Sequence, residues 1–205
     1  MRLRIGGPTL ALALLVASAA IALARPADQL SDAPSLASLR QGGYVIFLRH
    51  ALEDGVDQSP VDVNDCQTQQ FLTDQGRAQA RSIGQQFRAL GIPVGRVMNS
   101  QFCRARDTAV LAFGASETLD ILTPPGALPP ALRDEQPDAI RLLLSTPPVA
   151  GTNTVLVGHG GVLLPITGVN IDRAEAAIFV PRGAAGYTFV TILASDEWSA
   201  LARSK

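Results

Sequence analysis

The sequence has few charged residues and almost no net charge. Lysine, arginine, aspartate and glutamate make up 17% of its 205 residues, and the formal net charge is -1 at pH 7. Proteins that capture a polyanion usually present a large basic field, which this composition does not supply. We therefore expect no nucleic-acid partner, and any phosphate group must be held by a few local arginines.

Cysteine and histidine are scarce, with two residues of each in the whole chain. No C-x-x-C or H-x-x-x-H spacing is present, so no motif supports a structural zinc made of His50, His159, Cys66 and Cys103. That zinc site is kept only as an alternative. A disulfide between the two cysteines is the hypothesis for an exported protein, and two separate buried thiols are the other possibility.

The chain also lacks an apolar run of the roughly 20 residues that span a bilayer. Residues 9–23 are apolar and free of charge, follow Arg2 and Arg4, and end in Ala-Leu-Ala at 22–24. These three parts are typical of a secretory signal peptide. We expect a signal peptide over 1–24 and a periplasmic or secreted mature protein that does not contact the membrane. The alternative is a retained leader that anchors it.

The rest of the chain is long enough for one globular domain with a full core. Hydrophobic residues make up 47% of the sequence, as in ordinary packed proteins. Residues 25–41 mix proline, aspartate, serine and alanine, which predicts a linker or a short helical lead-in. The domain itself is expected over 42–205.

Hydrophobic patterning predicts alternating strands and helices in this domain. The apolar runs 44–48 and 154–157 are typical of strands buried on both faces. Further strands are expected over 94–99 and 187–193, and helices over 74–90, 104–113, 138–144 and 162–167. This order favours an α/β fold, a three-layer α/β/α sandwich with a mostly parallel sheet that receives ligands at the carboxyl ends of its strands.

Both histidines directly follow predicted buried strands. His50 comes after Arg49 at the end of the first strand, and His159 lies in the Gly-His-Gly-Gly turn at 158–161. Residues 100–109, Ser-Gln-Phe-Cys-Arg-Ala-Arg-Asp-Thr-Ala, place Arg104 at the start of a helix that follows a third strand. A single histidine at a strand end is more often structural. Three such strand ends, however, can converge on one site.

As a set, these residues resemble the phosphoglycerate-mutase-like branch of the histidine phosphatase superfamily. Its marks are Arg-His after the first strand, a Ser-x-x-x-Arg-Ala-x-x-Thr-Ala segment and a later Gly-His, and all three occur here in order. The resemblance covers 44–193, including 72–80, which is similar to the family's first helix. It implies a phosphoglycerate-mutase-like fold and a histidine acid-type phosphatase that hydrolyses phosphomonoesters.

The resemblance also implies a role for each of these residues. His50 would be the covalent nucleophile, and Arg49, Arg104 and His159 would bind the phosphoryl group. Arginine suits this role because its planar fork meets two phosphate oxygens and stays charged. The arginines would replace the magnesium of other phosphoryl-transfer enzymes, so no metal or organic cofactor is expected. Arg106 is expected to face elsewhere on the same helix.

An acid must also protonate the leaving oxygen. The candidate for this acid is Glu135, because of its position beside Asp134 in the segment after the Arg104 helix. The alternatives are Glu53 and Asp54. Leu52 stands where some relatives carry an acidic residue.

The expected partner is a small phosphorylated substrate of unspecified identity. A phosphoglycerate-mutase-like phosphotransferase and a phosphohistidine protein phosphatase are the rival enzymes, although the partners of both are intracellular. A catalytically silent phosphate-binding domain is the alternative that is not an enzyme. The oligomeric state is left open.

Overall fold

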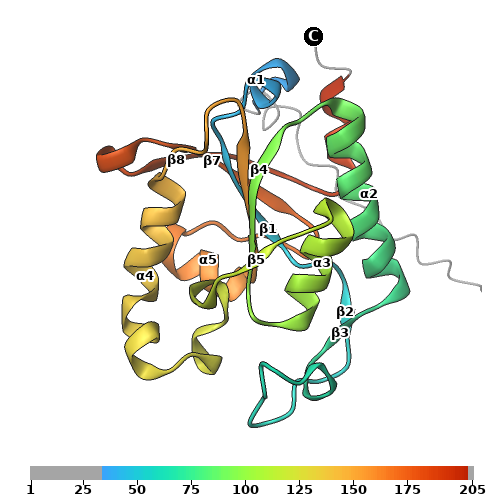
Figure 1. The fold of residues 1–205 in the computed structure, drawn as a ribbon, viewed down its shortest axis with the longest axis vertical. Coiled ribbons are helices and arrows are strands. Elements are labelled where there is room, and N and C mark those ends of the chain that lie inside the picture. Colours follow the sequence, from blue (N-terminus) through green and yellow to red (C-terminus); the bar gives the residue numbers. More distant parts are fainter. Residues whose placement is uncertain (1–33, 203–205) are drawn as a thin grey trace, which may run out of the picture.

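The computed structural model describes residues 34–202 of the chain (Figure 1). The predicted signal peptide therefore lies outside the described residues. The α-helices are α1 (Leu36–Gln41), α2 (Asp74–Leu90), α3 (Cys103–Phe113), α4 (Pro130–Ser145) and α5 (Gly160–Thr167). The strands are β1 (Val45–Arg49), β2 (Glu53–Asp54), β3 (Phe71–Leu72), β4 (Val94–Asn99), β5 (Glu117–Thr118), β6 (Asn153–Gly158), β7 (Ala176–Pro181) and β8 (Tyr187–Leu193). Between residues 34 and 202, none of the helices has the length and hydropathy needed to cross a bilayer.

The central sheet has six strands in the order β5-β4-β6-β1-β7-β8. Strands β5, β4, β6 and β1 run parallel, whereas β7 is antiparallel to β1 and the edge strand β8 is antiparallel to β7. The expected α/β class with a mostly parallel sheet is thus confirmed. The sequence analysis did not predict strand β7, the short edge strand β5 or the small antiparallel pair of β2 and β3.

Helices cover both faces of this sheet, as Figure 1 shows. Alternate residues of β1 point to opposite layers. Ile46 and Leu48 belong to the core cluster that includes residues of α2 and α3. Val45 and Phe47 belong to the cluster that includes residues of α4 and α5. Because β1 lies between two layers, its side chains are buried on both sides, which explains its continuous apolar sequence.

Helix α1 is part of the packed domain. Leu39 is fully buried, and its carbonyl oxygen accepts a hydrogen bond of 2.9 Å from the Asn153 side-chain amide. The Asn153 amide oxygen in turn accepts from the backbone N–H of Tyr44 at 3.1 Å. The short helical lead-in expected within 25–41 is therefore fixed to the start of β1 and β6.

The parallel register brings three strand ends to one edge of the sheet. Arg49 of β1 is paired with Gly158 of β6, and Asn99 of β4 is paired with Val157 of β6. The residues that follow these strands are His50, His159 and Ser100. They must therefore lie near one another at the carboxyl edge, where α/β proteins bind ligands.

Candidate active site

His50 is held at the carboxyl end of β1 by its backbone and by its ring. Its N–H donates to the Gly158 carbonyl at 3.1 Å, and its carbonyl accepts from the Ala174 N–H at 3.1 Å. The ring atom Nδ1 lies 3.0 Å from the Ala51 carbonyl oxygen and 3.3 Å from Glu53 Oε2. Two acceptors at Nδ1 keep the proton of a neutral ring on that atom, which leaves the lone pair on Nε2 for attack.

His159 faces His50 from the start of α5. The two ring centroids are 4.9 Å apart, and His159 Nε2 lies 2.9 Å from the Ser100 hydroxyl oxygen. Burial holds the pKa of His159 well below its usual range, and the nearby charges of His50, Arg104 and Arg49 lower it further. His159 is therefore neutral in the free protein, and the standing positive charge of the site comes from the arginines.

The arginine of the first motif lies beside the histidines. Arg49 donates from Nη1 to the Ile171 carbonyl at 3.0 Å. Its Nε is buried and has no hydrogen-bond partner among the described residues. A Cβ on Gly160 would lie 3.4 Å from Arg49 Nη1 and from the Ile171 oxygen, so the glycine leaves room for this contact. Arg49 thus keeps an unused donor for an anion.

Arg104 enters from the first turn of α3 and is almost completely buried. Its guanidinium carbon lies 4.3 Å from the centre of the Phe102 ring, and its two terminal nitrogens donate to the Asp57 carboxylate at 3.0 and 3.3 Å. Burial lowers the pKa of Arg104, which the Asp57 charge partly offsets. This paired, two-point contact is the geometry in which arginine also binds a phosphate group.

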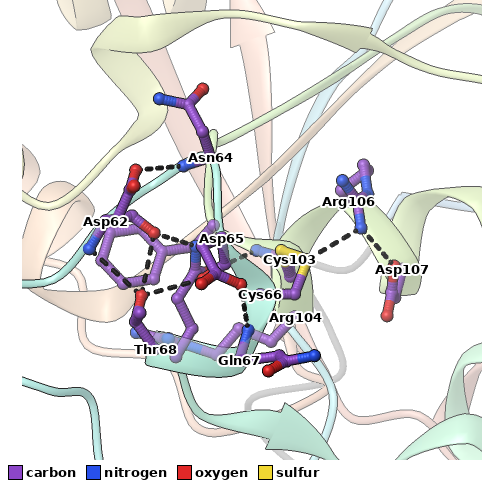
Figure 2. Close-up of a disulfide and its surroundings, with 12 residues drawn as sticks. Asp62, Asn64, Asp65, Cys66, Gln67, Thr68, Cys103, Arg104, Arg106 and Asp107 are labelled. Carbon is purple, nitrogen blue, oxygen red and sulfur yellow. Dashed lines mark hydrogen bonds and ion pairs between the residues drawn. A yellow bond between two sulfur atoms is a disulfide. The ribbon is translucent and has the colours of Figure 1, made fainter.

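The segment that carries Asp57 is fastened to α3 by the disulfide between Cys66 and Cys103. Figure 2 shows this bond at the first residue of α3, directly before Arg104. The Cys103 N–H also donates to the Gln69 side chain at 2.8 Å. The structure thus confirms the predicted disulfide. It removes the zinc alternative, because a bonded cysteine offers no thiolate ligand.

Arg106 lies between the disulfide and Asp107 (Figure 2). Its guanidinium lies 3.3 Å from Cys66 Sγ and 3.4 Å from Asp107, and its side chain is half exposed. Two residues along the same helix, Arg106 and Arg104 therefore face different surroundings.

Glu53 is the acidic side chain that contacts His50, although the sequence offered it only as an alternative acid. Its side chain is 4% exposed and pairs with both His50 and Arg173. Burial would raise the pKa of Glu53, but the hydrogen bonds from His50 and Arg173 outweigh it and hold the pKa well below the usual range. Glu53 is therefore ionised, which suits an acceptor better than a proton donor.

The candidate acid Glu135 lies on α4 with an exposed side chain. Within residues 34–202 no hydrogen bond or ion pair joins it to His50, and its role stays a prediction. Asp54 is also exposed and accepts a hydrogen bond from the Gly55 N–H. Neither carboxyl is gathered into the cluster at the strand ends.

Three further residues of the site carried no expected role. Ser100 is fully buried and contacts His159, Asp57 occupies the fork of Arg104, and Arg173 binds Glu53. Ser100 had a visible signal, since it opens the motif that contains Arg104. Asp57 and Arg173 lie in irregular segments with no motif of their own.

Two histidines and two arginines thus lie together at the carboxyl edge of a parallel sheet, where α/β proteins bind ligands, and such a set could bind an anion. Residues 45–127 match the histidine phosphatase superfamily (branch 1). This segment includes Arg49, His50 and Arg104, whereas His159 is added by the fold. Over this segment the chain thus resembles the histidine phosphatase superfamily, and the resemblance supports a phosphatase activity.

Solved structures of several phosphatases share the fold. The protein histidine phosphatase SixA, solved with tungstate, has a TM-score of 0.51 at 16% identity, covering 75% of this chain and 98% of its own. A candidate alpha-ribazole-5'-P phosphatase from Escherichia coli K-12 has a TM-score of 0.53 at 14% identity, with coverages of 75% and 97%. Phosphoserine phosphatase from Entamoeba histolytica, solved with 3-phosphoglyceric acid, has a TM-score of 0.51 at 16% identity, with coverages of 73% and 95%. No curated protein sequence matches the chain significantly.

Proposed function

We propose that this protein hydrolyses phosphomonoesters through a covalent phosphohistidine on His50, without a metal ion. The observation that carries the proposal is the arrangement of His50 itself. Its Nδ1 is occupied by the Ala51 carbonyl and Glu53, so Nε2 is the nucleophilic atom, and the His159 ring lies 4.9 Å away. Arg49 and Arg104 supply the positive charge that a phosphoryl group requires.

The reaction has two displacements at phosphorus. In the first, His50 Nε2 forms a bond to phosphorus while the ester P–O bond breaks, and the leaving oxygen takes up a proton. In the second, a water oxygen attacks phosphorus and gives a proton to the acid that protonated the leaving oxygen, the N–P bond breaks, and inorganic phosphate is released with His50 restored. Arg49, Arg104 and His159 would bind the non-bridging oxygens in both steps, so that catalysis rests on positioning and charge stabilisation.

The proposal places the reaction outside the cytoplasm. It is supported by the signal peptide expected over 1–24 and by the Cys66–Cys103 disulfide, a bond that persists in oxidising compartments. A small phosphorylated substrate in the periplasm or medium fits this location. The same location argues against a glycolytic mutase role and against intracellular phosphohistidine proteins as substrates.

Hydrolysis of p-nitrophenyl phosphate between pH 4 and 8 in EDTA tests this function. We expect turnover in the chelator, together with a phosphorylated intermediate that can be trapped by a rapid alkaline quench, because phosphohistidine survives in base. Peptide mass spectrometry should place the phosphate on His50 rather than His159. Activity that disappears in EDTA, or turnover with the phosphate on another residue, would contradict the mechanism.

A second prediction concerns the Asp57 carboxylate, which occupies the phosphate-binding fork of Arg104. An anionic substrate must displace it, so Asp57→Asn is expected to tighten the binding of inorganic phosphate by about three- to tenfold, the scale of one charge-assisted hydrogen bond. Competitive inhibition by phosphate measures this. Asp138→Asn removes an exposed carboxylate paired with Arg141 on α4 and is the matched control, with no change expected. Equal or weaker phosphate binding in Asp57→Asn would show that the carboxylate does not compete.

A further inference from the structure

The contacts behind His50 form a chain of three side chains. His50 Nδ1 lies 3.3 Å from Glu53 Oε2, and Arg173 Nε donates to both Glu53 oxygens at 2.8 Å. Building on the proposed function of His50, we propose that Glu53 and Arg173 position the nucleophile and stabilise the charge that its ring acquires during phosphoryl transfer.

The charge follows from the chemistry of the first displacement. A neutral ring that keeps its proton on Nδ1 and forms a bond to phosphorus through Nε2 becomes a cationic imidazolium ring. The Ala51 carbonyl, 3.0 Å from Nδ1, fixes the tautomer but carries no net charge. The Glu53 carboxylate, nearly inaccessible to solvent, adds a full negative charge beside the developing cation. Such a preorganised charge stabilises the transition state more than the ground state.

Arg173 fixes the carboxylate that performs this task. A buried glutamate is stable as an anion only when it is paired and hydrogen-bonded. The half-exposed Arg173 is this partner, and its guanidinium contacts both oxygens of the Glu53 carboxylate. Glu53 is thereby held in one orientation, with Oε2 left to face His50.

The loop that carries Arg173 also holds the other residues of the first motif. The Ile171 carbonyl accepts from Arg49, and the Ala174 N–H donates to the His50 carbonyl. Ala174 has a φ of 62°, in the left-handed region that non-glycine residues rarely adopt. Strained backbone of this kind persists where surrounding contacts determine it, and it gathers at functional sites. One short loop thus fixes the backbone of His50, the side chain of Arg49 and the carboxylate behind the nucleophile.

The kinetic test compares Glu53→Gln, Arg173→Met and Arg173→Lys with the wild type on p-nitrophenyl phosphate. For Glu53→Gln we expect kcat to fall by about 10- to 100-fold, the effect of losing a hydrogen bond to a charged group, while KM changes by less than about twofold. Arg173→Met should lower kcat in the same way but less, and Arg173→Lys should restore part of the loss. Arg96→Met on β4 removes an exposed ion pair with Glu117 of β5 and should leave both constants unchanged.

A spectroscopic readout separates this inference from the proposed function. With only two histidines, the ring ¹H–¹⁵N signals of His50 can be assigned, and its Nδ1 proton should move upfield in Glu53→Gln because the charged acceptor is lost. If this upfield shift is observed but the wild type shows no turnover, the phosphatase proposal is overturned, whereas the contact between Glu53 and His50 is supported. Wild-type turnover with an unchanged Nδ1 signal and unchanged kcat in Glu53→Gln would overturn the positioning role.

Discussion

His50→Ala is expected to lower kcat/KM for p-nitrophenyl phosphate by about 10⁴-fold or more, the scale seen when a covalent nucleophile is removed. The other histidine is not arranged to replace it. His159 Nε2 is engaged with the Ser100 hydroxyl, and burial keeps its ring neutral and fixed at the start of α5. Initial rates of purified variant and wild type, measured in EDTA, give this ratio directly.

Phosphate binding is the control for this variant. Arg49 and Arg104 remain in His50→Ala, so inorganic phosphate should still bind with an affinity within about tenfold of the wild type, as expected for the loss of one ligand among several. Residual activity above one hundredth of the wild-type rate, with phosphate binding retained, would show that another group attacks phosphorus. Loss of both properties with a lower melting temperature would indicate a folding defect, and His50→Asn would then replace alanine in the test.

Local signals predicted much of the fold. Helix α2 begins after Thr73, whose hydroxyl accepts from the Gly76 N–H, and ends at Gly91 in the left-handed conformation. Both residues are ordinary cap signals that can be identified in a sequence. Strands β4 and β8 likewise have the predicted bounds.

Other elements depend on contacts that the sequence pattern does not contain. Helix α4 begins at Pro130 and continues through Pro137, whereas the sequence predicted a start at residue 138. A proline inside a helix normally breaks it, but burial of Ile140 and Leu144 against the sheet stabilises this one. Strand β7 follows helix α5 but runs antiparallel to β1, so it departs from the parallel strand–helix alternation, and its first two residues are alanines with little strand preference.

The candidate site likewise contains residues that the sequence pattern predicted and residues that it did not. Arg49, His50, Arg104 and His159 follow predicted strands, so the parallel topology was enough to bring them to one edge. The Glu53–Arg173 and Asp57–Arg104 pairs join residues 120 and 47 positions apart, and loop packing alone decides such pairs. Glu135 was chosen as the acid from its position in the chain, and the structure places it on α4 with an exposed side chain.

Loss of the Cys66–Cys103 disulfide is expected to lower the free energy of unfolding by about 4 kcal/mol in the loop-entropy model. The bond closes a loop with a sequence separation of 37, and without it the unfolded chain gains conformational freedom. For a domain of this size the melting temperature should fall by roughly 10 °C. Thermal unfolding of Cys66→Ser/Cys103→Ser against the oxidised wild type measures the effect.

The disulfide also determines which part of the molecule loses order first. Besides the disulfide, the segment with Asp57 contacts α3 through the pair with Arg104, the hydrogen bond from the Cys103 N–H to Gln69 and the contact of Arg106 with Cys66 Sγ. In the double serine variant, hydrogen exchange should therefore accelerate over 55–70 more than in the strands of the central sheet. Wild type treated with a reductant should behave in the same way. An unchanged melting temperature together with unchanged exchange over this segment would show that the bond contributes nothing to stability. Faster exchange in the segment alone would instead show that the disulfide stabilises residues 55–70 rather than the whole fold.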